Sequence, residues 1–196
     1  MQKIIASDFD GTLTTRDSMM EIIIYQRGRW GLYRALICIL PWLVLMFIGL
    51  YSNQKTKERL LFHCFGKMSR EELDAFCQRF ADSHRGILRA SLYNELKARE
   101  KDEDTEVVVV TASPEIWVSK LLPGMTVLGT RLEFDSHGFT GRFLTPNCYG
   151  QEKVNRLLQH IPDITDHRSR YHITAYGDSR GDRQLLDFAD EKHWVK

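Results

Sequence analysis

Three apolar runs along the chain end in polar or acidic residues, the pattern of buried parallel strands whose carboxyl ends meet at one edge of a sheet. These runs are residues 3–7 (KIIAS), 105–113 (TEVVVVTAS) and 171–178 (YHITAYGD). Segments with helical patterns, including 115–122 and 151–160, separate them. The pattern predicts an α/β fold in which helical crossovers join the strands of a parallel sheet.

The first two predicted strands are separated by roughly 90 residues, far more than a crossover needs, so we expect an insertion there. In its second half, Ser69 and Glu72 have the spacing of a helix capping box, and an apolar face follows them. Later, residues 127–144 alternate around a Ser-His-Gly turn, which predicts a β-hairpin beside the sheet.

The composition changes this picture little. The 27 basic and 26 acidic side chains leave a net charge of +1, which gives no indication of nucleic-acid binding. The four cysteines form no CxxC pair, so neither a disulfide framework nor a zinc site is predicted. The apolar part of the N-terminus is too short for a signal peptide, and we expect a cytoplasmic protein.

Two acidic motifs follow the predicted strands. In DFDGT (8–12), Asp8 and Asp10 would project to the same side if strand geometry persists, so they can share one ligand. Two close carboxylates need a cation or a shared proton, and a hard ion such as Mg²⁺ takes oxygen ligands of this type. In GDSRGD (177–182), Asp182 is placed to cap the following helix, which would hold Asp178 beside the other strand ends.

Two weaker signals complete the candidate site. Thr111 is the first polar residue after four valines, so its hydroxyl is a candidate donor to a phosphate oxygen, with Ser113 as a competitor. Lys153 lies near a helix N-terminus, where anions are favoured. Taken singly, these residues also fit a turn, a helix cap or a solvated helix face.

The order of these four motifs resembles that of the haloacid dehalogenase superfamily of phosphotransferases, and the resemblance spans the chain. It implies a Rossmann-like core with an inserted, mainly helical cap. We expect the core to comprise residues 1–14 and 101–196 and the cap to comprise residues 15–100.

The resemblance also implies roles for the motif residues. Asp8 is expected to be the nucleophile, and Asp10 the general acid and base, with its backbone carbonyl on Mg²⁺. Thr111 and Lys153 would hold the phosphoryl oxygens, while Asp178 would bind the metal and Asp182 would orient metal-bound water or Lys153.

Asp10 points to phosphate esters as substrates, because the dehalogenases of the superfamily lack this carboxylate. The insertion resembles the cap of the phosphoserine phosphatase branch, which closes over the site and selects the substrate. Asp17 occupies the position of a substrate-facing Glu in those enzymes, so it is a candidate selector. A solvated loop residue is the alternative.

Residues 35–51 are seventeen consecutive positions without a charge, near the lower limit for a membrane span. A single crossing is excluded, because Asp8 precedes the run and Thr111 follows it, yet both must meet in one site. Basic flanks and Pro41 favour a shallow hairpin that enters one leaflet. A buried helix pair within the cap and a dimer interface remain alternatives.

With this segment the chain resembles the bacterial phosphatidylglycerophosphatases of the superfamily, as residues 144–157 also do, although GDSRGD departs from their pattern. We therefore expect a Mg²⁺-dependent phosphatase that acts on a phosphorylated lipid headgroup at the cytoplasmic face of the inner membrane. A phosphatase of small metabolites such as phosphoserine is the first alternative. A transferase with another acceptor and a non-catalytic membrane-binding module are the others.

Overall fold

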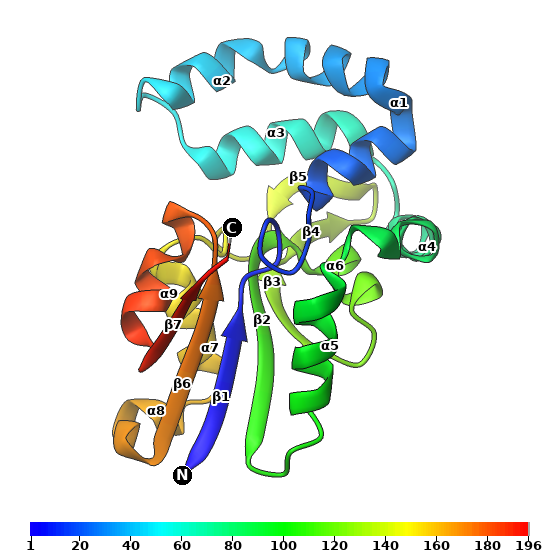
Figure 1. Cartoon of the computed structure of the whole chain (residues 1–196). Coiled ribbons are helices and arrows are strands. Elements are labelled where there is room, and N and C mark those ends of the chain that lie inside the picture. Colours follow the sequence, from blue (N-terminus) through cyan, green and yellow to red (C-terminus); the bar gives the residue numbers. More distant parts are fainter. Residues whose placement is uncertain (196) are drawn as a thin grey trace.

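The main sheet is parallel, and helices of the inserted segment lie beyond the carboxyl ends of its strands (Figure 1). The computed structural model describes residues 1–195. In this part of the chain the main sheet has the strand order β3-β2-β1-β6-β7, and β4 and β5 form a separate antiparallel pair. The strands are β1 (Gln2–Ser7), β2 (Thr105–Pro114), β3 (Thr126–Thr130), β4 (Leu132–Asp135), β5 (Gly138–Phe143), β6 (Tyr171–Gly177) and β7 (Glu191–Trp194).

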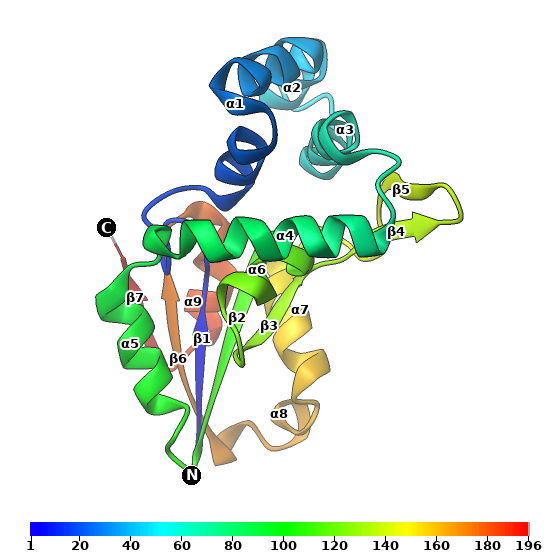
Figure 2. The same ribbon diagram turned by 90° about the vertical axis from the view of Figure 1, so that its right-hand side faces the viewer.

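Helices cover both faces of the sheet and extend beyond its carboxyl edge (Figures 1 and 2). The α-helices are α1 (Ser18–Cys38), α2 (Leu40–Phe47), α3 (Asn53–Phe65), α4 (Arg70–His84), α5 (Ala90–Arg99), α6 (Glu115–Leu121), α7 (Gln151–His160), α8 (Asp163–Asp166) and α9 (Arg183–Phe188). Short 3₁₀ turns are η1 (Arg85–Ile87), η2 (Arg168–Arg170) and η3 (Arg180–Asp182).

Alternation along the strands divides the core between the two faces of the sheet. Ile4 and Val108 belong to a buried cluster with residues of α7 and α9, whereas Ile5 and Val107 belong to a second cluster with residues of α5 and α6. Because both faces are covered, the strands read as nearly continuous apolar runs. The predicted α/β fold class is confirmed.

The predicted hairpin at 127–144 is only partly correct. Strands β4 and β5 do pair antiparallel, with Asp135 opposite Gly138. Residues 126–130, however, form β3, which pairs in parallel with β2 as the edge of the main sheet. An alternating edge strand and a hairpin arm have the same local pattern, so the residues alone did not separate them.

The inserted segment packs partly on the core and partly above it. Helix α4 begins at the predicted capping box, in which Glu72 N donates to Ser69 Oγ and Ser69 N donates to Glu72 Oε2. Helix α4 packs on α6, α5 packs on β2, and α3 packs on β5. The division into core and cap at the bounds given above stays a prediction.

The apolar segment 35–51 lies mostly on the surface rather than inside the cap. Helix α1 bends at Gly28, whose φ of 69° and ψ of 171° are not helical, and bends again by 63° where α2 begins. The helix therefore breaks next to Pro41, as expected, and Pro41 lies in the first turn of α2. The chain reverses later than a hairpin centred on Pro41 would, between α2 and α3 (Figure 1). No residue of α2 is buried, which contradicts the alternative of a buried helix pair.

Among residues 1–195, no single helix is long and apolar enough to cross a membrane. The bent pair α1 and α2 passes that criterion of length and composition when the two helices are taken together.

Candidate active site

The carboxyl ends of β1, β2 and β6 bring the sequence motifs together. Strand β1 lies between β2 and β6, and all three run in parallel. Asp8 follows β1 and donates its backbone N–H to the carbonyl of Tyr176 at 2.9 Å, while Thr111 lies near the end of β2 and Asp178 directly follows β6. These motifs, distant in the sequence, therefore meet at one edge of the sheet.

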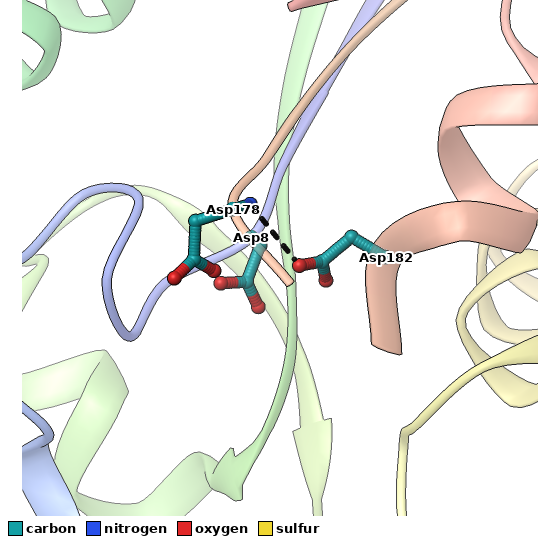
Figure 3. Close-up of side chains that lie close together, drawn as sticks. All are labelled: Asp8, Asp178 and Asp182. Carbon is teal, nitrogen blue, oxygen red and sulfur yellow. Dashed lines mark hydrogen bonds between the residues drawn. The ribbon is translucent and has the colours of Figure 1, made fainter. Parts of the chain in front are cut away.

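Three carboxylates form an acidic cluster at this edge (Figure 3). Asp8, Asp178 and Asp182 each offer an oxygen, and these oxygens lie within 4.8 Å of one another. Three close carboxylates repel unless a cation or protons neutralise them, and oxygen ligands of this kind suit Mg²⁺. The donor set therefore fits a hard divalent cation.

Asp10 is not part of this cluster, so the expectation that Asp8 and Asp10 share a ligand through their side chains is wrong. Strand β1 ends at Ser7, and the alternation of side chains does not continue through the turn. The Asp10 carboxylate instead accepts hydrogen bonds from Ser18 N at 2.6 Å and from Ser113 Oγ at 2.5 Å. Burial, followed by the charge of Asp17, raises the pKa of Asp10.

Lys153 projects from α7 into the buried centre of the site. Only 2% of Lys153 is exposed, and its Nζ donates to Asp8 and, at 2.5 Å, to Asp182. Burial alone would lower the pKa of Lys153, but the two carboxylates outweigh it and the pKa is raised. Burial raises the pKa of Asp8 to about 7, against the opposing attraction of Lys153. A bound cation would favour the ionised form of Asp8.

Asp182 fixes the loop that carries Asp178. Its Oδ2 accepts hydrogen bonds from Asp178 N at 3.2 Å, Ser179 N at 2.9 Å and Ser179 Oγ at 2.7 Å. Although burial acts in the opposite direction, Lys153 and Ser179 hold the pKa of Asp182 below its ordinary value. Asp182 occupies the N-cap position of α9, but its side chain completes a capping box with Ser179 at the start of η3 instead of capping α9 itself.

The DFDGT turn needs its glycine for two reasons. Gly11 has a φ of 86°, in the left-handed region, and a Cβ there would lie 2.2 Å from Asp178 Oδ2. The turn therefore approaches the acidic cluster more closely than a side chain would allow. The next residue, Thr12, donates its hydroxyl to Asp178 Oδ1 at 3.5 Å.

A cavity of about 150 Å³ opens above Asp8, and Asp10, Thr111 and Lys153 also line it. The Thr111 hydroxyl accepts a hydrogen bond from Ser113 N at 3.0 Å and keeps its own proton for donation. Ser113 also lines the cavity, but its hydroxyl donates to Asp10. Thus both candidate donors lie at the cavity, and Thr111 is the one whose proton is not committed among the described residues.

The inserted segment supplies further residues to this cavity. Asp17 lines it and caps α1 by accepting a hydrogen bond from Met20 N at 2.9 Å. Lys57 of α3 and Tyr149 also line the cavity. The sequence patterns did not identify Lys57 as a site residue, because its place over the sheet is set by how α3 packs and by nothing in its neighbouring sequence.

Comparisons with known proteins agree with this arrangement. The chain is 29% identical over 197 residues to protein CicA of Caulobacter vibrioides. The aligned region covers 96% of this chain and 84% of CicA. A Bordetella pertussis protein of unknown function has a similar structure, with a TM-score of 0.80, 19% identity, and coverage of 98% of this chain and 89% of that one. A phosphoserine phosphohydrolase-like protein from Francisella tularensis gives a TM-score of 0.64 at 16% identity, with coverage of 98% and 86%.

A family model described as haloacid dehalogenase-like hydrolase matches residues 5–187, a range that includes all four sequence motifs. The resemblance inferred from the order of those motifs is confirmed. The chain belongs to the haloacid dehalogenase-like hydrolases.

Proposed function

We propose that this protein is a Mg²⁺-dependent phosphate monoester hydrolase that works through a phosphorylated Asp8. The observation that carries the proposal is the buried contact of Asp8 with Lys153, beside the acidic cluster that Asp8 forms with Asp178 and Asp182. The carboxylate proposed as the nucleophile thus has a cation in contact with it and further oxygens beside it that can bind a metal. The phosphohydrolase-like name of a structural neighbour is in line with this reaction.

In the first step, an oxygen of Asp8 attacks the phosphorus of the ester, and the bond from phosphorus to the ester oxygen breaks. The departing oxygen takes a proton from Asp10, whose raised pKa favours the protonated form. Lys153 and the Thr111 hydroxyl stabilise the charge that grows on the phosphoryl oxygens. Mg²⁺ bound by Asp8, Asp178 and the Asp10 carbonyl would neutralise further negative charge.

In the second step, water attacks the phosphorus of the phosphorylated Asp8. Asp10, now ionised, accepts the proton of this water, and the bond between phosphorus and Asp8 breaks to release inorganic phosphate. Asp182 holds Lys153 and the Asp178 loop in place through both steps. Each carboxylate thus has its own role, and Asp10 returns to its starting protonation state.

For the substrate, we favour a phosphorylated lipid headgroup such as phosphatidylglycerophosphate over a small metabolite such as phosphoserine. Helix α2 and the adjoining loop expose large apolar side chains above the catalytic cavity, including Phe47 (82% exposed) and Leu50 (73% exposed). Such a surface suits peripheral contact with a membrane. Cations flank the apolar segment on both sides, which favours the cytoplasmic face of the inner membrane.

The reaction is tested by phosphate release from an aryl phosphate with and without Mg²⁺. Asp8→Asn should abolish release. Asp166→Asn should leave it unchanged, because Asp166 is an exposed carboxylate of α8, at the opposite end of the sheet (Figure 1). Absence of release by the folded, Mg²⁺-loaded wild type across all esters would contradict the proposal and favour a membrane-binding module. Transfer of the phosphoryl group to an added alcohol in preference to water would favour a transferase.

The substrate class is tested in parallel with phosphatidylglycerophosphate in detergent micelles and with phosphoserine. A kcat/KM at least about 100-fold higher for the lipid, corresponding to about 2.8 kcal/mol of transition-state binding, is expected. A preference for phosphoserine would overturn the lipid assignment while leaving the phosphatase reaction intact.

A further inference from the structure

Two adjoining cavities lie between the apolar helices and α3, away from the catalytic cavity. One has a volume of about 410 Å³ and lies between α2 and α3; the other, of about 380 Å³, lies between α1 and α3. Cys38 and His63 line both of them. We call the two cavities together the cap groove. No residue that lines it also lines the catalytic cavity.

The cap groove is lined by cations without carboxylates. Arg27 and Arg34 line one cavity, and Arg59 and Lys67 line the other. Among residues 1–195, none of these four has a carboxylate oxygen within 4.0 Å. Residues 22–69 contain seven Lys and Arg side chains but only one acidic residue, in a chain of net charge +1. This part of the chain therefore leaves the positive charge of the groove unneutralised, and that charge would attract an anion.

Two of these cations are held in place by the surrounding structure. Arg27 donates hydrogen bonds to the carbonyls of His63 at 2.9 Å and Cys64 at 3.0 Å. Arg59 lies over the ring of Trp42, with 4.4 Å from its guanidinium carbon to the ring centroid, and donates to the hydroxyl of Tyr51 at 2.9 Å. The groove therefore presents positive charge from fixed positions, which lowers the entropy cost of binding.

The same groove has an apolar side. Ile39, Trp42 and Phe62 line the cavity that also contains Arg59 and Lys67. It continues onto the exposed apolar surface of α2, where Leu40 and Val44 are about half exposed. A ligand that satisfies both sides must carry an anionic group next to a hydrocarbon chain. Each cavity has the volume of an ordinary small-ligand site.

We propose that the cap groove binds one molecule of anionic phospholipid, with its phosphate among the four cations that line the groove and an acyl chain along Trp42 and Phe62. This site is distinct from the catalytic cavity and would hold a lipid that is not the substrate. It goes beyond the proposed reaction, because it requires no turnover. Its position beneath the apolar helices would let a bound lipid fix α1 and α2 relative to α3 at the membrane.

Cys38 provides a direct readout of occupancy. Of the four cysteines it is the exposed one, whereas Cys64, Cys77 and Cys148 are buried. The rate of its modification by a water-soluble maleimide is measured with dihexanoyl phosphatidylglycerol kept below its micellar concentration, so that no membrane surface is present. Phosphatidylglycerol at a concentration of roughly ten times its Kd should slow the modification of Cys38 about tenfold. Dihexanoyl phosphatidylcholine, which lacks the net negative charge, and glycerol 1-phosphate, which lacks the acyl chains, should slow the modification much less.

Charge variants distinguish a specific site from general attraction. Arg34→Gln and Lys67→Gln should each remove most of the protection by phosphatidylglycerol, measured as the ratio of rates without and with lipid. Arg29→Gln is the matched control, because Arg29 is an exposed cation of the same helix that does not line the groove, and it should retain the protection. Unchanged melting temperatures verify that the variants fold.

Three results would overturn the inference. Equal protection of Cys38 by phosphatidylcholine would mean that the groove does not recognise the negative charge of the lipid. Equal protection by glycerol 1-phosphate would mean that the groove does not recognise the acyl chain. Equal losses in Arg29→Gln and Arg34→Gln would mean that only the overall charge matters. Because thiol modification is measured, failure here leaves the phosphatase proposal untouched, and an inactive enzyme leaves the groove inference untouched.

Discussion

At the scale of single residues, Asp10 differs from the other carboxylates of the site, Asp8, Asp178 and Asp182, in the groups that surround it. Its two oxygens accept hydrogen bonds from Ser18 N and Ser113 Oγ, so the carboxyl is held away from Lys153, which contacts Asp8 and Asp182. Burial raises the pKa of both Asp8 and Asp10, but only Asp8 has the Lys153 ammonium against it to favour the ionised form, whereas Asp10 is left as the carboxyl that can donate a proton. The surroundings of Asp8 and Asp10 thus suit a nucleophile and an acid, respectively.

Asp10→Asn should therefore slow the hydrolysis of esters with poor leaving groups more than that of esters with good leaving groups. For an alkyl phosphate we expect kcat to fall about 10²- to 10⁴-fold, because the alkoxide then leaves without a proton. For an aryl phosphate with a stable phenolate the loss in the first step should be much smaller. Rapid-quench measurement of that step compares the two esters, and equal losses would contradict the role of Asp10 as the acid.

Lys57 is the cation that the inserted segment brings to the catalytic cavity. Burial lowers the pKa of Lys57, although the nearby carboxylates of Asp17 and Asp10 oppose this shift. Within residues 1–195 its ammonium makes no ion pair. It is therefore available to an anionic group of the substrate other than the phosphoryl group that is transferred.

Lys57→Met should raise KM about tenfold for esters that carry a second anionic group, on the scale of one hydrogen bond to a charged group. KM for a plain aryl phosphate should change little. Lys55→Met, at an exposed position on the same helix, is the control and should behave as wild type. The same rise in KM for both kinds of ester would show that Lys57 acts on the shape of the cavity instead.

At the scale of elements, helix α4 has the clearest local start signal in the inserted segment. The reciprocal hydrogen bonds of Ser69 and Glu72 satisfy two backbone N–H groups that would otherwise lack partners. Ser69→Ala should lower the free energy of unfolding by about 1 kcal/mol. Chemical denaturation measures this, with Ser91→Ala in α5 as the control, since Ser91 caps nothing. Equal stability of both variants would mean that tertiary contacts alone hold the start of α4.

The sequence patterns predicted the elements that local chemistry determines. The runs before Asp8, Thr111 and Asp178 form strands whose apolar residues are mostly buried, and helix α7 lies where the helical pattern at 151–160 predicted it. Strand β3 was assigned to the wrong sheet, because the partner of an alternating strand is set by tertiary contacts.

The candidate site was predictable to a similar extent. Parallel strands bring their carboxyl ends together, so the motif residues could be placed in one site without coordinates. The hydrogen bonds of Asp182 and the presence of Lys57 could not be predicted in this way. They depend on the course of a loop and on the packing of α3, neither of which leaves a periodic signal.

For the whole molecule, the main feature is an exposed apolar surface on the side that carries the catalytic cavity. We expect the double variant Phe47→Ser, Leu50→Ser to lose most of its binding to vesicles that contain phosphatidylglycerol, because about 2 kcal/mol of apolar burial per side chain is removed. Flotation with the vesicles measures this binding.

Leu144→Ser is the control for this variant, because Leu144 is 61% exposed but lies outside the apolar helices. Its vesicle binding should remain that of wild type, and hydrolysis of an aryl phosphate should be unchanged in all variants. Wild-type binding by the double variant would mean that the surface faces something other than a lipid bilayer.

The central claim is that Asp8 carries the phosphoryl group during the reaction. The most direct measurement is acid quenching within a single turnover of Mg²⁺-loaded enzyme and ester, followed by mass spectrometry of the N-terminal peptide. The account predicts a transient phosphoryl group on Asp8 that forms and decays at rates matching turnover and is absent in Asp8→Asn. Full turnover with no phosphorylated Asp8 at any time, together with release of phosphate by Asp8→Asn, would contradict it.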